Sequence, residues 1–279
     1  TRGNYRRARE HCEFAPIRLN FKKGEVRNTL LDGQDKIKLV THCKSFEDGY
    51  EQLVFREYLA YALFRELTDI SYGVRLLRIT YFDTEKDREF TRFGFVIEDD
   101  KNVARRNALE LIDEKSLGHG DHDRGRQNLV HVFEYMIGNT EYSLTNPEPG
   151  KPCCHNVDIL SATAGPPFTA LPFDFDFSGL VNAPYAEPNP KYPIRNVRTR
   201  LYKGLCGNND LLPDTLQLFR EKRTQLFELI EAIREHSVAA KHSAQSVRNY
   251  IESFYRIIDD PEEVRERLIG KCVEAEPVD

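Results

Sequence analysis

The chain has 279 residues, of which 40% are hydrophobic and 11% aromatic, enough to build one large domain or two closely packed lobes. No apolar run approaches the roughly 20 residues that a membrane-spanning helix requires, so no membrane span is expected. With 40 basic and 45 acidic residues the net charge is −5, which argues against nucleic acid as a partner. An anionic ligand must be held by a local cluster of Lys and Arg.

The cysteine content favours an exported protein. The six cysteines are Cys12, Cys43, Cys153, Cys154, Cys206 and Cys272. An even number without a CxxC motif is typical of disulfides, and buried free thiols are the alternative. We expect Cys12 to pair with Cys43, and Cys153 or Cys154 to pair with Cys206. The start at Thr1 instead of Met suggests that a leader or other N-terminal segment has been removed.

Two clusters of possible metal ligands offer a zinc site as an alternative to disulfides. One is Cys153, Cys154 and His155, and the other is the histidine- and aspartate-rich stretch at residues 119–123. Neither cluster has the ligand spacing of a zinc finger, so disulfides are the preferred interpretation.

Two stretches near the N-terminus alternate polar and apolar side chains with a period of two, which predicts strands. They span residues 16–21 and 36–40, and turn-forming residues 31–34 lie between them. An apolar pattern of helical spacing then predicts one long helix over residues 46–67.

Strand character returns at residues 74–82 and 90–98, which a charged turn separates as in a hairpin. A helical apolar pattern over residues 129–137 leads to Gly138. The segment from residue 182 onward is expected to be a loop, because four prolines fall within residues 184–193. Helical patterns beyond residue 213 predict a small C-terminal bundle, whose last helix starts at Pro261 with Asp260 as its cap.

The polar loop after Gly138 begins a series of candidate ligands for phosphoryl transfer. Glu141 comes first along the chain, Asn156 second, and Asp174 and Asp176 third. Kinase-like folds supply an acid residue that orients the acceptor, a metal-ligating Asn and a metal-ligating Asp in this order.

The paired aspartates predict a metal site. Asp174 and Asp176 alternate with phenylalanines at positions 173, 175 and 177, so on a strand both carboxylates would face one way. Two like charges so close are costly unless a cation compensates them, which favours Mg²⁺ with Asn156 as a further oxygen donor.

The candidate nucleotide-binding residues lie mainly in the N-terminal third. Lys36 and Lys38 share one face of the second predicted strand, and Lys38 is the choice for the phosphates; a solvated strand face is the alternative. Glu57 can pair with Lys38, unless it is an ordinary surface Glu. Glu98 and Asn139 complete the candidates, although Asn139 can instead fix the loop backbone.

These motifs resemble those of the spore-coat CotH family of atypical kinases. The resemblance covers roughly residues 15–235 and is carried by the Lys38 strand, the helix at residues 57–61, the strand at 94–98, and the loops at 138–140 and 172–176. Membership would imply a bilobal protein-kinase-like fold, ATP with Mg²⁺ or Mn²⁺, and frequent action on exported proteins.

At one position the chain departs from the family pattern. The family has Asp in the catalytic loop, whereas this chain has Glu141, whose carboxylate lies one methylene further out. A misplacement of about 1 Å can cost about 100-fold in rate, so Glu141 is a weakened base, a retuned base or the mark of a pseudokinase. No GxGxxG loop precedes Lys38, so Lys, Arg and turn amides must hold the nucleotide.

The sequence thus predicts an α+β, bilobal protein-kinase-like fold, with a small antiparallel-sheet N-lobe and one long helix in residues 1–100, and a mostly helical C-lobe in residues 101–279. We expect an ATP- and metal-dependent phosphotransferase that acts on a protein or small-molecule hydroxyl. A nucleotide-binding pseudokinase or partner-binding module without turnover is the alternative, and AMP transfer is a third. An exported location is favoured over a cytoplasmic one.

Overall fold

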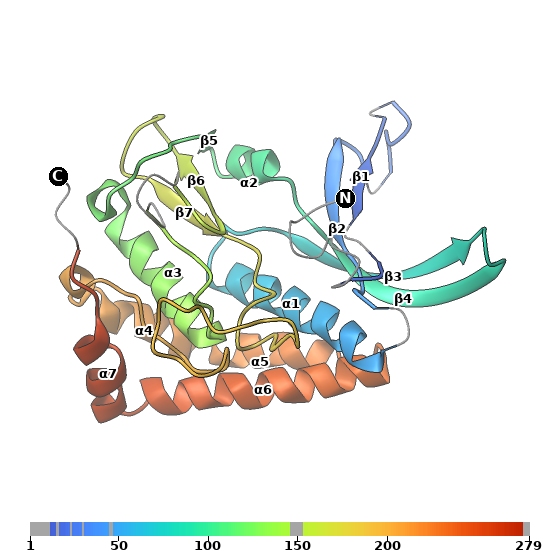
Figure 1. Ribbon diagram of the computed structural model, residues 1–279. Helices are drawn as coiled ribbons and strands as arrows, with labels where there is room; N and C mark the ends of the chain where they lie inside the picture. Colours follow the sequence, from blue (N-terminus) through green and yellow to red (C-terminus); the bar gives the residue numbers. More distant parts are fainter. Residues whose placement is uncertain are drawn as a thin grey trace.

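Two small antiparallel sheets and seven α-helices make up the described part of the chain in this computed structural model (Figure 1). The structure describes residues 12–14, 17–22, 24–29, 31–44, 47–145 and 153–275. The predicted α+β class is confirmed. Residues 16 and 46, where a predicted strand and the long helix start, lie outside the described residues.

The larger sheet lies in the N-terminal third and has four strands in the order β1-β2-β4-β3. Its strands are β1 (Ile17–Asn20), β2 (Lys36–Val40), β3 (Val74–Asp83) and β4 (Arg88–Ile97). All three pairings are antiparallel: β1 with β2 and β3 with β4 are the two predicted pairs, and the pairing of β2 with β4, which was not predicted, joins them. Strand β4 is therefore enclosed by β2 and β3, whereas β3 forms one edge of the sheet.

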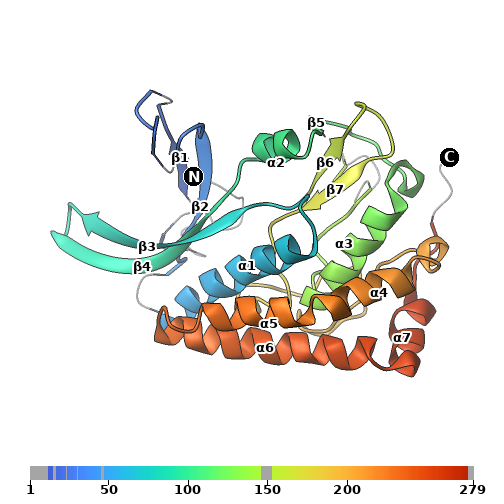
Figure 2. The same cartoon turned by 180° about the vertical axis from the view of Figure 1, so that it is seen from behind.

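Helix α1 (Asp48–Leu67) joins the larger sheet to the C-terminal helices. It packs against β4 on one side and against α6 (Val238–Ile258) on the other, as Figures 1 and 2 show from opposite sides. Its side chains Phe55, Leu59 and Leu63 are fully buried. The helix is therefore a central element whose position is fixed by two partners.

A second sheet of three strands, which the sequence analysis did not predict, lies beside α3 (Arg124–Ile137). Its strands are β5 (Glu110–Ile112), β6 (Val157–Ser161) and β7 (Thr169–Pro172), and the short helix α2 (Asp100–Arg106) precedes β5. Helix α3 packs against β7, and its predicted end at Gly138 is confirmed. The ends of α3, β6 and β7 carry the candidate catalytic and metal-binding residues.

The C-terminal helices form the predicted bundle around α6. They are α4 (Leu212–Glu221), α5 (Arg223–Ala232), α6 and α7 (Pro261–Arg267). The Asp260 side chain accepts a hydrogen bond from the Glu262 N–H, so the predicted start of α7 is confirmed. The proline-rich segment at residues 182–205 contains no helix or strand, also as predicted. Within the described residues, no helix is long and apolar enough to cross a membrane.

The structure pairs all six cysteines in three disulfides. Cys12 pairs with Cys43, with Cα atoms 4.6 Å apart, which confirms that expectation. The expected bond from Cys153 or Cys154 to Cys206 is wrong. The two adjacent cysteines pair with each other, and Cys206 pairs with Cys272 at a Cα distance of 4.9 Å. The chain around Cys206 lies next to the C-terminal segment, where Leu205 and Val273 form a β-bridge.

Candidate active site

The candidate catalytic loop starts at Gly138, where the backbone of α3 turns into a left-handed conformation. Gly138 has φ of 65°, and a Cβ atom at this position would lie 2.1 Å from the Tyr250 hydroxyl oxygen. Its carbonyl accepts a 3.0 Å hydrogen bond from the Gly179 N–H. Only glycine satisfies both the backbone angle and the close approach of α6.

Hydrogen bonds with the side chains of two asparagines fix the backbone on both sides of Glu141. The Asn139 Oδ1 accepts a 3.0 Å hydrogen bond from the Glu141 N–H. The Asn156 Nδ2 donates a 2.7 Å hydrogen bond to the Glu141 carbonyl. Asn139 is buried, and its hydrogen bond with the Glu141 N–H holds the loop backbone, which is one of the two roles considered for it.

Lys203, which lies in the proline-rich segment at residues 182–205, also holds this loop in place. Its ammonium donates hydrogen bonds of 2.6 Å to the Tyr142 carbonyl and 3.4 Å to the Thr140 carbonyl. The two carbonyls bracket Glu141 in the chain. Burial lowers the pKa of Lys203 to about 8, and the negative charges of Glu134 and Glu141 oppose that shift.

The Glu141 carboxylate faces a cavity of about 850 Å³. His155 lines the same cavity, and its Nε2 lies 3.5 Å from Glu141 Oε2. A hydrogen bond from His155 lowers the pKa of Glu141, so the carboxylate is ionised at neutral pH. Asn189, Lys191 and Tyr192 of the proline-rich segment also line this cavity, and a hydrogen bond from the Asn189 side chain further lowers the pKa of Glu141.

A group of buried polar side chains lies on the α3 side of the loop. Glu134 is fully buried beside the Asn139 side chain, whose hydrogen bond favours the ionised carboxylate without offsetting the effect of burial. Burial raises the pKa of Glu134 to about 8. His131 Nδ1 lies 2.7 Å from the Tyr142 hydroxyl, and burial lowers the pKa of this histidine. The catalytic loop therefore packs against buried polar side chains that have little access to solvent.

The segment at residues 173–176 does not form the predicted strand. Strand β7 ends at Pro172, and Asp174 has φ of 61°, which breaks the alternation of a strand. The expectation that Asp174 and Asp176 share one strand face is therefore wrong. Asp174 is partly exposed, whereas Asp176 is buried and its Oδ2 accepts a 3.2 Å hydrogen bond from the Tyr185 hydroxyl.

Asn156 lies against the aspartate segment as well as the catalytic loop. Its carbonyl accepts a 2.9 Å hydrogen bond from the Phe173 N–H, which continues the β6–β7 pairing by one residue pair. Asn156 has φ of 53°, a left-handed conformation that Asn tolerates better than most residues. Asn156 thus connects the two segments: its side chain bonds to Glu141, and its backbone carbonyl bonds to Phe173, the residue before Asp174.

Helix α1 contacts the aspartate segment from the other side. The Tyr61 hydroxyl oxygen accepts a 2.8 Å hydrogen bond from the Asp174 N–H. Glu57, one turn earlier, is buried instead of being a surface residue, and it lines a small cavity with Tyr185. Tyr185 also donates a hydrogen bond to Asp176, so this tyrosine links the cavity that Glu57 lines to the aspartate segment.

Lys38 and Lys36 occupy different environments on β2. Lys36 is exposed, whereas Lys38 is partly buried. The Lys38 ammonium lies 5.4 Å from the centre of the Phe173 ring and 5.9 Å from that of Tyr72. Burial and the neighbouring Asp100 raise the pKa of Asp99, and the positive charge of Lys38 opposes that rise. Lys38 therefore lies between the aspartate segment and the start of α2.

The Glu98 carboxylate is occupied by contacts within the protein. It accepts a 3.0 Å hydrogen bond from Arg106 Nε and a 2.9 Å hydrogen bond from the Gly73 N–H. These contacts connect the end of β4 to α2 and to the residue before β3. The structure thus gives this carboxylate a role in holding chain segments together.

No group of three or more His, Cys, Asp or Glu side chains suited to a metal ion occurs within the described ranges. Residues of both proposed zinc half-sites, His119 and His155, line the large cavity, but Cys153 and Cys154 are joined in a disulfide. A magnesium site at the aspartates would have to use Asn156, whose Oδ1 is an oxygen donor of the kind Mg²⁺ prefers.

Lys203, Tyr61 and Tyr185 were not predicted as site residues, and His155 was considered only as a zinc ligand. His155 had a signal, because it precedes Asn156 directly in the chain. Lys203 and Tyr185 come from the proline-rich segment, whose sequence gives no periodic pattern from which a position could be predicted.

Comparison with known proteins adds no assignment to this arrangement. No protein-family model matches the chain, and no curated protein matches it either.

Proposed function

We propose that this protein is an ATP- and divalent-metal-dependent phosphotransferase with a bilobal kinase-like fold, acting on a hydroxyl group of a protein or small molecule. One observation carries the proposal. Asn156 hydrogen-bonds the Glu141 carbonyl through its side chain and the Phe173 N–H through its backbone. The candidate acceptor-orienting residue and the candidate metal-binding segment therefore belong to one connected unit, as phosphoryl transfer requires.

The metal would be held by Asn156, Asp174 and Asp176. Their amide and carboxylate oxygens are suitable donors for Mg²⁺ or Mn²⁺, and Asp176 is buried with its Oδ2 accepting a hydrogen bond from Tyr185. A bound divalent cation supplies positive charge that neutralises the nucleotide phosphates. Asn156 Nδ2 is used by the Glu141 carbonyl, which leaves the amide oxygen as the donor for the metal.

Lys38 is the proposed phosphate-binding residue. It lies beside Phe173, the residue before Asp174, so its ammonium is on the same side of the fold as the proposed metal ligands. Glu57 lies on α1 near Tyr185 and Asp176, a position from which it can hold a basic group over the phosphates. Lys36 is exposed at the start of β2 and would act through its long-range charge.

Glu141 would orient the acceptor hydroxyl and accept its proton. Its carboxylate is ionised at neutral pH and faces a cavity large enough for a side chain or a small molecule. The hydrogen-bonded loop fixes the backbone of Glu141 and limits the positions that its longer side chain can reach.

A nucleotide-binding pseudokinase is the second candidate, and the His155 contact favours it. With Nε2 only 3.5 Å from Glu141 Oε2, His155 competes with an acceptor hydroxyl for the carboxylate. An enzyme with this contact must displace His155 during turnover, whereas a binding protein need not.

The three disulfides support an exported protein, because disulfides persist in oxidising compartments. Export is part of the proposal and agrees with the resemblance to CotH kinases.

Incubation of the purified protein with ATP labelled separately at the α- and γ-phosphates, with and without Mn²⁺, tests the proposed function. Metal-dependent transfer of the γ-label to protein or to an added acceptor is the expected result. Transfer of the α-label would indicate AMP transfer instead. Metal-dependent ATP binding with no transfer of either label would identify the pseudokinase.

A further inference from the structure

The outer edge of β3 is a place where another strand can add. Strand β3 is the edge strand of the larger sheet, and with β4 it forms a long hairpin that extends away from the helices (Figure 1). Its ten residues pair with β4 over their whole length. Edge strands of this length carry a row of backbone groups that can pair with an incoming chain.

The hydrogen-bond pattern shows which backbone groups point outward. Glu98 N–H donates to the Gly73 carbonyl at 2.8 Å, and Phe93 N–H donates to Glu51 on α1 at 3.0 Å, away from β3. Because bonded and non-bonded pairs alternate in an antiparallel ladder, the pair of Arg78 with Phe93 is non-hydrogen-bonded. The backbone groups of Arg78, and by the same alternation those of Leu76 and Thr80, therefore point to the outer edge.

Nothing that the structure describes covers this edge. Within the described residues, no hydrogen bond from outside the sheet reaches the backbone of residues 76–80. Phe82, on the same face of the hairpin as Arg78, is 60% exposed. The edge is thus long, regular and accessible along one face.

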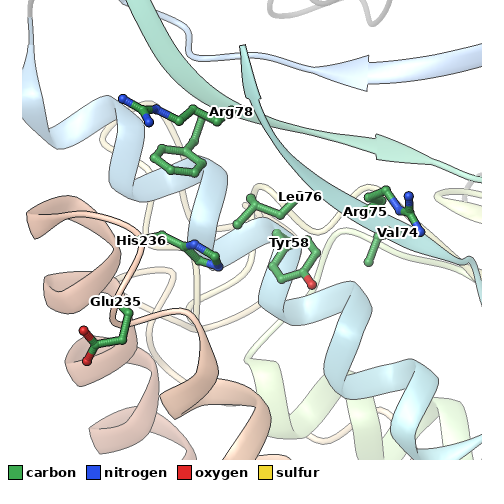
Figure 3. Close-up of a pocket in the computed structure, with 8 residues that line it drawn as sticks. Tyr58, Val74, Arg75, Leu76, Arg78, Glu235 and His236 are labelled. Carbon is green, nitrogen blue, oxygen red and sulfur yellow. The ribbon is translucent and has the colours of Figure 1, made fainter.

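A groove of about 570 Å³ lies beside the start of this edge (Figure 3). Its lining comes from α1, β3, β4 and the connection between α5 and α6, and it consists of Tyr58, Val74, Arg75, Leu76, Arg78, Phe93, Glu235 and His236. Phe93 packs against His236 with ring centres 5.8 Å apart. The groove therefore offers Tyr58, Leu76 and Phe93 as packing partners for an aliphatic or aromatic side chain, next to polar lining residues.

The charges around the groove favour an acidic occupant. Arg75 and Arg78 are exposed, and in the described part of the chain neither makes an ion pair or a side-chain hydrogen bond. Glu235 is the one carboxylate among the lining residues, and it lies at the helical end of the groove (Figure 3). The chain's own residues 1–11 carry four arginines and would be repelled by these two.

From the edge strand, the groove and the two arginines we infer that this surface docks an extended acidic segment of another protein. The segment adds as a strand along the outer edge of β3, places an apolar side chain in the groove, and pairs its carboxylates with Arg75 and Arg78. In strand addition, main-chain hydrogen bonds give affinity, and pockets for alternate side chains give specificity. This inference does not depend on the proposed phosphotransferase activity.

Selection from a phage-displayed library of random dodecapeptides tests the inference, with EDTA and without nucleotide so that the proposed active site takes no part. Enriched peptides are expected to combine acidic and apolar residues. Their synthetic forms should bind Arg75→Glu/Arg78→Glu at least about tenfold more weakly, since like charges across an interface oppose binding. Arg256→Glu, the same charge change on α6, is the matched control and should bind normally.

A second pair of variants tests strand addition. Thr80→Pro removes an outward N–H and should lose most of the binding, whereas Thr80→Val keeps that N–H and should retain it. Circular dichroism checks that both variants are folded. Enrichment of peptides without acidic residues, or equal binding to the double Arg variant, would overturn the inference.

Discussion

The side chain of Asn156 holds the backbone of Glu141, fifteen residues earlier in the chain, through a 2.7 Å hydrogen bond from Nδ2 to the carbonyl oxygen. The same residue takes a left-handed conformation and accepts a hydrogen bond from Phe173 N–H. Asn156 therefore combines three properties: a rare backbone angle, an amide donor, and contact with both parts of the proposed site.

Substitution of Asn156 separates these properties. Asn156→Gly keeps the left-handed angle but loses the amide, and should lower the free energy of unfolding by about 1 kcal/mol. Asn156→Ala should cost about 1 kcal/mol more, because a Cβ atom disfavours this conformation. Urea denaturation measures both values. Equal stability of the two variants would contradict the backbone angle described for this residue.

Lys203 should control the order of the catalytic loop. Lys203→Met removes the donor to the Thr140 and Tyr142 carbonyls, so amide hydrogen exchange of Glu141 and Ser143 should become at least about tenfold faster. Lys191→Met, which changes another lysine at the same cavity, is the matched control. Unchanged exchange in Lys203→Met would show that the loop is held without this ammonium.

Glu134 should make stability depend on pH. Burial raises its pKa in the folded protein to about 8, above the ordinary value of 4.5, so the folded state binds the proton more tightly than the unfolded state. The stability from this group is complete below the unfolded pKa of about 4.5 and is lost as pH rises toward 8, by up to about 1.4 kcal/mol per pH unit.

Glu134→Gln removes this titration. The variant should match the wild type near pH 5 and be more stable by a few kcal/mol near pH 8. Burial lowers the pKa of Lys203 from 10.5 to about 8, so the change in stability that comes from Lys203 occurs above pH 8 and does not overlap that of Glu134. Thermal denaturation of both proteins across the range gives the difference, with the exposed Glu228→Gln as control. A difference that does not change with pH would contradict the burial of a carboxyl group at this position.

The disulfide between Cys206 and Cys272 closes a loop with a sequence separation of 66 residues. In the chain-entropy model, its removal by Cys206→Ser/Cys272→Ser should lower stability by about 4 kcal/mol. Peptide mapping without reductant should find Cys206 linked to Cys272. A link from Cys206 to Cys153 or Cys154 would restore the pairing expected from sequence and contradict the structure.

The sequence predicted the elements whose pattern repeats over many residues. Helices α1, α3 and α6 have long apolar stripes, and β3 and β4 are long runs of strand-forming residues separated by a charged turn, so local sequence patterns were sufficient. The second sheet was missed because β5 has three residues and its partner β6 lies more than forty residues away. Pairing over that distance leaves no local signal.

For the same reason, only part of the candidate site could be predicted from the sequence. Asn139 and Glu141 lie in a loop directly after a predictable helix, so their proximity was evident from sequence. The contacts of Lys203 and Tyr185 depend on how an irregular, proline-rich segment folds back over the loop. The left-handed angle of Asp174 was missed because the aspartate–phenylalanine alternation imitates a strand.

The γ-phosphate transfer activity of Glu141→Gln, compared with the wild type and Glu141→Asp, tests the central claim most directly. If Glu141 orients the acceptor, Gln should abolish transfer and leave metal-dependent ATP binding intact, whereas Asp should preserve or raise transfer. A wild type without activity that Glu141→Asp restores would show a kinase site silenced by one methylene. Transfer that is unchanged in Glu141→Gln would contradict the catalytic role of this residue, and ATP binding without transfer in all three proteins would contradict the phosphotransferase itself.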